Sequence, residues 1–180
     1  MNLPTGFGNP GPTIKTEGKT FTTMAHNLSG VITGFTYTGD LPNVMLAEGY
    51  HLIPFDSTAS DGTAEAPIPP SEALTTATLE AIRKLSMLGK CAYIETAYFG
   101  GIGTQFSIIW EKGQQIEGPL ISYDGIEPKV KYQQVKRVEG AINQALRLLG
   151  VRRQEDKDEF DTVGLGRYRS NRKILGQAGD

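Results

Sequence analysis

The chain has 180 residues, of which 38% are hydrophobic and 21% charged, and its 20 acidic and 18 basic side chains give a net charge of −2. This length and composition predict a single domain that needs no disulfide or metal to bury a core. The near-neutral charge argues against the basic surface of a duplex-binding protein, so nucleic acid is not an expected partner. No apolar run is long enough for a membrane span.

Residues 1–23 are rich in Gly, Pro and Thr and hold few apolar side chains. Such a segment buries too little apolar surface to offset the entropy of ordering it. We expect a flexible arm, which is either an extension without a role or an element that docks on a partner or on a second copy of the chain. The folded core is expected to span 24–151, and 152–180 is expected to be a charge-mixed segment on the surface.

Five segments have the alternating or β-branched pattern of strands. They cover residues 28–37, 50–55, 91–99, 105–111 and 115–122. The last three are separated by short connections that contain glycine, which predicts an antiparallel meander.

Two further segments carry apolar residues at helical spacing. The first, 71–89, has Ser71 as its expected N-cap and Gly89 at its end, and the second, 135–149, ends before Gly150. Together with the strands, these helices predict an α+β fold. We expect an antiparallel sheet of about five strands with both helices packed on one face.

The most distinctive motif is a predicted hairpin turn that combines glycines with aromatic residues. Glycine permits positive φ and close approach of another chain or ligand, and aromatic side chains provide rigid contact area. The alternative is an ordinary hairpin whose aromatic residues pack on the core. The candidate binding residues of this turn are Tyr98, Phe99, Gly100, Gly101, Gly103 and Gln105.

Glu95 precedes this turn and lies in the middle of a predicted strand. We count it among the candidate binding residues. A carboxylate there can also serve as a general acid or base in a cleft, with Tyr93, Tyr98 or His26 as the second group. The alternative is a structural sheet residue. No set of residues has the spacing of a catalytic constellation, so no catalytic residue is assigned.

The remaining candidates are weaker. His26, His51 and Cys91 have no metal-ligand spacing, so neither a metal nor a cofactor is expected. The single cysteine and the absence of a secretory signal pattern lead us to expect a cytoplasmic protein. A secondary basic patch near the C-terminus contains Arg167, Arg169, Arg172 and Lys173. It suits an acidic partner, although nearby acids can neutralise it.

Several motifs together resemble a group of small bacterial proteins for which no activity is established. They are the Met-Ala-His-Asn-Leu start, the Ala-Tyr-Ile-Glu-Thr strand, the Tyr-Phe-Gly-Gly-x-Gly-x-Gln turn, Ala-Ile-Asn-x-Ala-Leu-x-x-Leu-Gly-Val, and Asp-Glu-Phe-Asp-x-x-Gly-Leu-Gly-Arg. Here they occupy 24–28, 92–96, 98–105, 141–151 and 158–167. The resemblance implies a bacterial, cytosolic protein whose domain starts at Met24.

These observations favour a small binding or inhibitor protein, of the immunity or regulator kind, that acts on a protein partner through the 98–105 turn. An enzyme or small-ligand domain that uses Glu95 is the first alternative. A structural subunit that forms homo-oligomers through residues 1–23 is the second.

Overall fold

The computed structural model describes residues 26–55, 65–125 and 135–177. The expected arm at 1–23 and the expected domain start at Met24 lie outside these residues.

One seven-stranded sheet forms the centre of the protein, in the order β2-β3-β1-β4-β5-β6-β7. Neighbouring strands are antiparallel except β6 and β7, which are parallel. The strands are β1 (His26–Thr33), β2 (Val44–Met45), β3 (His51–Pro54), β4 (Cys91–Phe99), β5 (Ile102–Glu111), β6 (Gln114–Asp124) and β7 (Lys136–Arg137). The helices are η1 (Ala47–Gly49), α1 (Thr76–Leu85), α2 (Ala141–Leu149), α3 (Glu159–Thr162), η2 (Leu165–Arg167) and α4 (Asn171–Gln177).

The α+β class and the β4-β5-β6 meander agree with the sequence prediction, but the strand count does not. The sheet has seven strands and not five. The two additional strands, β2 and β7, have two residues each and lie at the two edges. Segments this short carry no periodic signal, because alternation needs about four residues to be visible.

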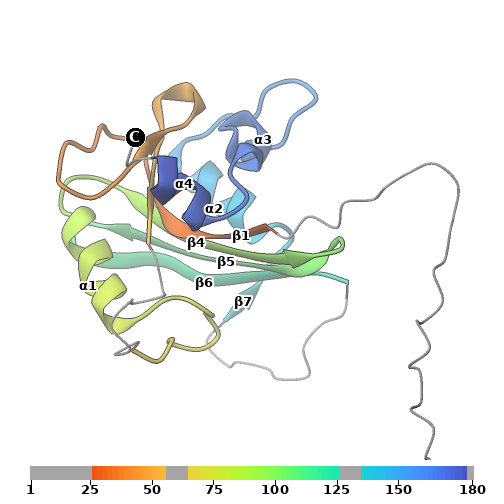
Figure 1. Cartoon of the computed structure of the whole chain (residues 1–180), viewed down its shortest axis with the longest axis horizontal. Coiled ribbons are helices and arrows are strands. Elements are labelled where there is room, and N and C mark those ends of the chain that lie inside the picture. The colour runs from red at the N-terminus through yellow and green to blue at the C-terminus, as the bar shows by residue number, and fades with distance from the viewer. Residues whose placement is uncertain (1–25, 56–64, 126–134, 178–180) are drawn as a thin grey trace, which may run out of the picture.

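The two main helices cover opposite faces of the sheet, so the prediction that they share one face was wrong. Ala92 and Ile94 of β4 belong to a core cluster that contains residues of α2. Their neighbours Cys91 and Tyr93 belong to a second cluster, with residues of α1. Figure 1 shows α1 on one side of the sheet and α2 and α4 on the other. Because both faces are buried there, residues 91–94 of β4 are hydrophobic on both sides.

The first predicted helix is shorter than expected at its start. Helix α1 begins at Thr76 and not at residue 71, and Thr75 caps it by accepting the N–H of Thr78 at 3.2 Å. Ser71 does accept the N–H of Leu74 at 2.6 Å, as an N-cap would, but this bond closes a separate turn ahead of the helix.

The second predicted helix also starts later than expected. Residues 136–137 form β7, and α2 begins at Ala141 after Gly140, whose φ is 66°. Side chains of the sheet satisfy the first free N–H groups of α2, since Ser122 accepts from Ala141 at 3.0 Å and Gln105 accepts from Ile142 at 3.1 Å. These contacts are distant in sequence, so no local pattern indicates them.

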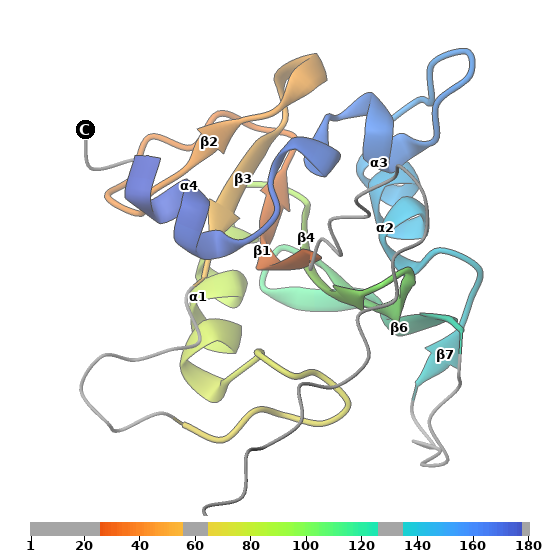
Figure 2. The same ribbon diagram turned by 45° about the vertical axis from the view of Figure 1, so that its right-hand side comes forward.

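The C-terminal segment is part of the core and does not lie on the surface as predicted. Val163, Leu165 and Ile174 are fully buried and join the α2 cluster. Asn171 at the start of α4 donates to the carbonyl oxygen of Ser29 at 2.7 Å. Figure 2 shows α3 and α4 on the same side of the sheet as α2. This packing places residues 157–169 beside His26 at the start of β1 and Tyr98 near the end of β4.

Candidate functional site

The turn predicted from glycine and aromatic residues is the tip of the β4–β5 hairpin. Phe99 pairs with Ile102, which leaves Gly100 and Gly101 as a two-residue loop. Both glycines have positive φ, 63° and 83°, as type I′ hairpin turns require. The flanking side chains do not pack on the core, because Phe99 is 69% exposed and Ile102 is 51% exposed.

Tyr98 and Gln105 connect the base of this hairpin to the rest of the fold. The Tyr98 hydroxyl donates to Asp124 of β6 and accepts from Gln105 Nε2 at 3.1 Å. Gln105 Oε1 accepts from Ile142 of α2. Burial and the hydrogen bond to Asp124 raise the pKa of Tyr98 to about 12, so the phenol stays protonated. The hairpin is therefore held on a fixed base while its tip is exposed.

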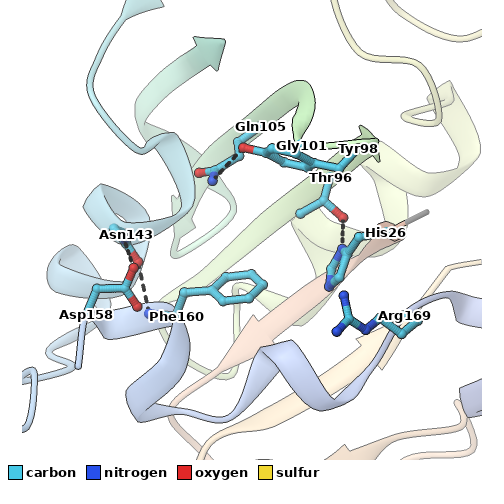
Figure 3. Close-up of a pocket in the computed structure, with 9 residues that line it drawn as sticks. All are labelled: His26, Thr96, Tyr98, Gly101, Gln105, Asn143, Asp158, Phe160 and Arg169. Carbon is cyan, nitrogen blue, oxygen red and sulfur yellow. Dashed lines mark hydrogen bonds between the residues drawn. The ribbon is translucent and has the colours of Figure 1, made fainter. Parts of the chain in front are cut away.

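A cavity of ≈360 Å³ lies beside this base, a size typical of small ligand sites. The hairpin contributes one side of it, and β1 and the C-terminal segment contribute the other (Figure 3). Its lining includes His26, Thr96, Tyr98, Gln105, Phe160 and Arg169. The cavity thus joins three candidates of the predicted turn, Tyr98, Gly101 and Gln105, to residues that are far away along the chain.

Helices α2 and α3 form the remaining wall. Asn143 of α2 donates to Asp158 at 2.9 Å and accepts the N–H of Phe160 at 2.9 Å. Arg147 binds both carboxylate oxygens of the buried Glu159, at 3.1 and 3.2 Å. These bonds fix the short α3 on α2 and place Phe160 over the cavity.

His26 is the buried histidine of the cavity, with 8% of its surface exposed. Its Nδ1 lies 2.6 Å from Thr96 Oγ1, and its ring packs at 5.8 Å from that of Phe160. Its Nε2 has no hydrogen-bond partner among the described residues. Burial and the positive charge of Arg169 lower the pKa of His26 below 6.5, so the native imidazole is neutral at pH 7.

This neutral histidine predicts a loss of stability in mild acid. Below pH 6.5 the unfolded chain binds a proton at residue 26 before the native protein does, so the free energy of unfolding falls as pH decreases. We expect His26→Gln to show a smaller fall than the wild type between pH 7.5 and 5.5. Urea unfolding at several pH values measures this, and equal slopes for both proteins would contradict it.

Glu95 lies on the opposite face of the sheet from this cavity. Its carboxylate accepts from the hydroxyls of Ser71 and Tyr93, the latter at 2.6 Å, and from the N–H groups of Glu72 and Ala73 at 3.0 and 3.2 Å. Burial and the adjacent carboxylate raise the pKa of Tyr93.

Of the partners proposed for Glu95, only Tyr93 contacts it. Strand residues alternate between faces, so Thr96 and Tyr98 point away from Glu95 and toward His26. Among the second groups considered for Glu95, the structure therefore brings Tyr93 to it, and places Tyr98 and His26 at the other cavity. Glu95 does line a second cavity, with Ser71 and Phe106, on the α1 side.

The basic patch is divided by the fold. Arg169 is half-buried in the cavity wall, and Arg167 lines an adjoining cavity of ≈530 Å³. Arg172 and Lys173 are exposed on α4 and line neither cavity.

The sequence analysis did not predict four residues that line the cavity, Thr96, Asn143, Asp158 and Phe160. All four lie inside motifs that carry the resemblance, which is the signal that could have identified them.

Comparisons with protein families, with curated proteins and with solved structures found no match for this chain. The resemblance drawn from the motifs therefore stays an expectation.

Within the described ranges, no three His, Cys, Asp or Glu side chains come together as a metal site would require. No helix in that part of the chain is long and apolar enough to cross a membrane.

Proposed function

We propose that this chain is a binding protein that recognises a protein partner through the β4–β5 hairpin and the cavity at its base. The observation that carries the proposal is the exposed pair Phe99 and Ile102 at the tip of a hairpin whose base is fixed. Large apolar side chains that stay exposed on a rigid element are typical of interaction sites.

The fixed base matters for affinity. A partner that buries Phe99 and Ile102 does not have to order the hairpin first, because Tyr98 and Gln105 already hold it against β6 and α2. Binding energy is lost when loops become ordered on association, and a preorganised loop avoids this loss. Each apolar side chain buried at an interface contributes about 1.5–3 kcal/mol before such costs.

Among the possible roles of such a binding protein, we favour that of an inhibitor or immunity protein. A protruding, preorganised hairpin can block a partner's site without any chemistry of its own. The alternative of catalysis by Glu95 has less support, because all four described contacts of this carboxylate are with donors of its own chain. The other alternative is assembly through residues 1–23, and these residues lie outside the described part of the chain.

The test is site-specific photocrosslinking in cells of the source organism. A photoreactive phenylalanine analogue at position 99 is expected to give one discrete protein adduct. The same analogue at position 116 is the matched control, because Ile116 is also exposed (46%) but lies in β6 toward the other end of the sheet. Adducts of equal yield at both positions, or none at position 99, would refute the proposal.

A second pair of variants distinguishes specific recognition by the hairpin tip from non-specific association of the protein surface. With the crosslinker at position 99, Ile102→Asp is expected to reduce the adduct at least tenfold, because it places a charge beside the contact. Met45→Asp changes a residue that is 72% exposed in β2 and is expected to leave the yield unchanged. Equal yields from both variants would show that the tip is not the contact.

A further inference from the structure

The cavity beside the hairpin has an unusual arrangement of hydrogen-bond donors at its inner wall. Most of its polar side chains already have partners in the protein. Gln105 bonds to Tyr98 and to Ile142, and Asn143 bonds to Asp158 and to Phe160. His26 and Arg169 differ, because neither Nε2 of His26 nor the guanidinium of Arg169 has a hydrogen bond or ion pair within the described chain.

The hydrogen on His26 is assigned by its neighbour Thr96. Thr96 is buried, and its Oγ1 accepts the backbone N–H of Leu28 at 3.0 Å and lies 2.6 Å from His26 Nδ1. If Nδ1 donated to this oxygen, the Thr96 hydroxyl hydrogen would have no acceptor among the described residues, so the favoured arrangement has Thr96 donating to Nδ1. In a neutral imidazole the remaining hydrogen then sits on Nε2, so this nitrogen is a donor.

Nε2 of His26 and the guanidinium of Arg169 point toward each other (Figure 3). Two groups that only donate now face each other without an acceptor between them. Arg169 is also close enough for its charge to act on His26. A buried donor without a partner destabilises the protein, and an acceptor that reached both groups would recover this energy.

We propose that this cavity binds a carboxylate group, held by the guanidinium of Arg169 and the Nε2–H of His26. A carboxylate has two coplanar acceptor oxygens, and these match the planar fork of an arginine. Arg169 also neutralises its charge. A phosphate has a larger charge and more oxygens to satisfy than these two side chains provide. The proposal deepens the proposed function, on which it rests, since it names an acidic side chain as the part of the partner that enters the cavity.

Other charged groups near the site are consistent with an anion at this position. Asp158 lies across the cavity, but its carboxylate accepts from Asn143 and from the N–H of Asp161. The adjoining cavity shares His26, Phe160 and Arg169 and adds Lys157, Arg167 and Asp161. With Arg169 included, three cations against one acid line that cavity and favour the approach of a negatively charged group.

The test uses propionate as the probe, with neutral propionamide as the matched control, at constant ionic strength to hold screening fixed. We expect propionate to shift the imidazole NMR signals of His26 saturably, to leave those of His51 unchanged and to raise the pKa of His26. Propionamide is expected to give no saturable shift. A blocked tripeptide, acetyl-Gly-Glu-Gly-amide, is expected to bind at least as tightly as propionate, as an acidic side chain of a partner would.

Arg169→Gln is expected to weaken propionate binding at least tenfold, while Arg172→Gln, on the exposed face of α4, leaves it unchanged. Circular dichroism shows whether both variants fold. Saturable binding of inorganic phosphate without propionate binding would overturn the carboxylate assignment, and so would equal affinities in the two variants. Crosslinking at position 99 does not depend on this probe, so failure here alone rejects the carboxylate and leaves partner binding by the hairpin standing.

Discussion

Glu95→Ala is expected to lower the free energy of unfolding by about 3–5 kcal/mol. The substitution removes the common acceptor of two hydroxyls and two backbone N–H groups. Tyr93 is fully buried, and Ser71 is 6% exposed, so water cannot easily replace the lost carboxylate. Urea unfolding followed by circular dichroism measures the change.

Glu80→Ala provides the matched control for this prediction. Glu80 is exposed on α1 and has no hydrogen bond in the described structure, so its loss should change stability by less than about 0.5 kcal/mol. If Glu95→Ala were as stable as Glu80→Ala, Glu95 would have no structural role. Its buried position would then favour the alternative in which it takes part in chemistry.

Gly103→Ala is expected to destabilise the protein by about 2–3 kcal/mol and to displace Tyr98. A Cβ at this position would overlap the carbonyl oxygen of Ala97 and would lie 2.6 Å from Cγ of Tyr98. The ring of Tyr98 would have to move, which breaks its bonds to Asp124 and Gln105. Urea unfolding gives the energy, and the NMR signals of the Tyr98 ring report the displacement.

Gly101→Ala is the matched comparison, because it changes the same hairpin without a collision. A Cβ at residue 101 meets nothing within 4 Å, and only the φ of +83° opposes it. Backbone strain of this kind costs about 1 kcal/mol. Gly101→Ala should therefore be the milder variant and should keep the Tyr98 signals. The reverse order would mean that close packing at Gly103 does not hold the hairpin base.

These variants also separate the two faces of β4. Glu95→Ala removes contacts on the α1 side, whereas Gly103→Ala acts on the hairpin base and the cavity on the α2 side. If the proposed function is right, partner crosslinking at position 99 depends more on Gly103 than on Glu95, as long as both variants remain folded.

The local sequence pattern was sufficient to predict the elements whose conformation depends on local interactions. Residues 91–99 were predicted as a strand and form β4 with the same bounds, and the hairpin turn was identified from Gly100 and Gly101. Positive φ at two successive residues is a property of those residues, so the sequence indicates it directly. The starts of α1 and α2 were misplaced because their N-terminal N–H groups are satisfied by Thr75 and by Ser122 and Gln105, which the apolar stripe does not reveal.

The sequence by itself determined the α+β class, the meander and the position of the hairpin turn, whereas the exposure of Phe99 at its tip came from the structure. Only the tertiary structure decided which face each helix covers, because an amphipathic stripe shows that a helix is buried but not against which side of a sheet. It also decided the site, since His26, Thr96 and Arg169 are far apart along the chain and carry no common motif. Their proximity follows from the pairing of β1 with β4 and from the packing of the C-terminal segment, which are long-range contacts that no local periodicity encodes.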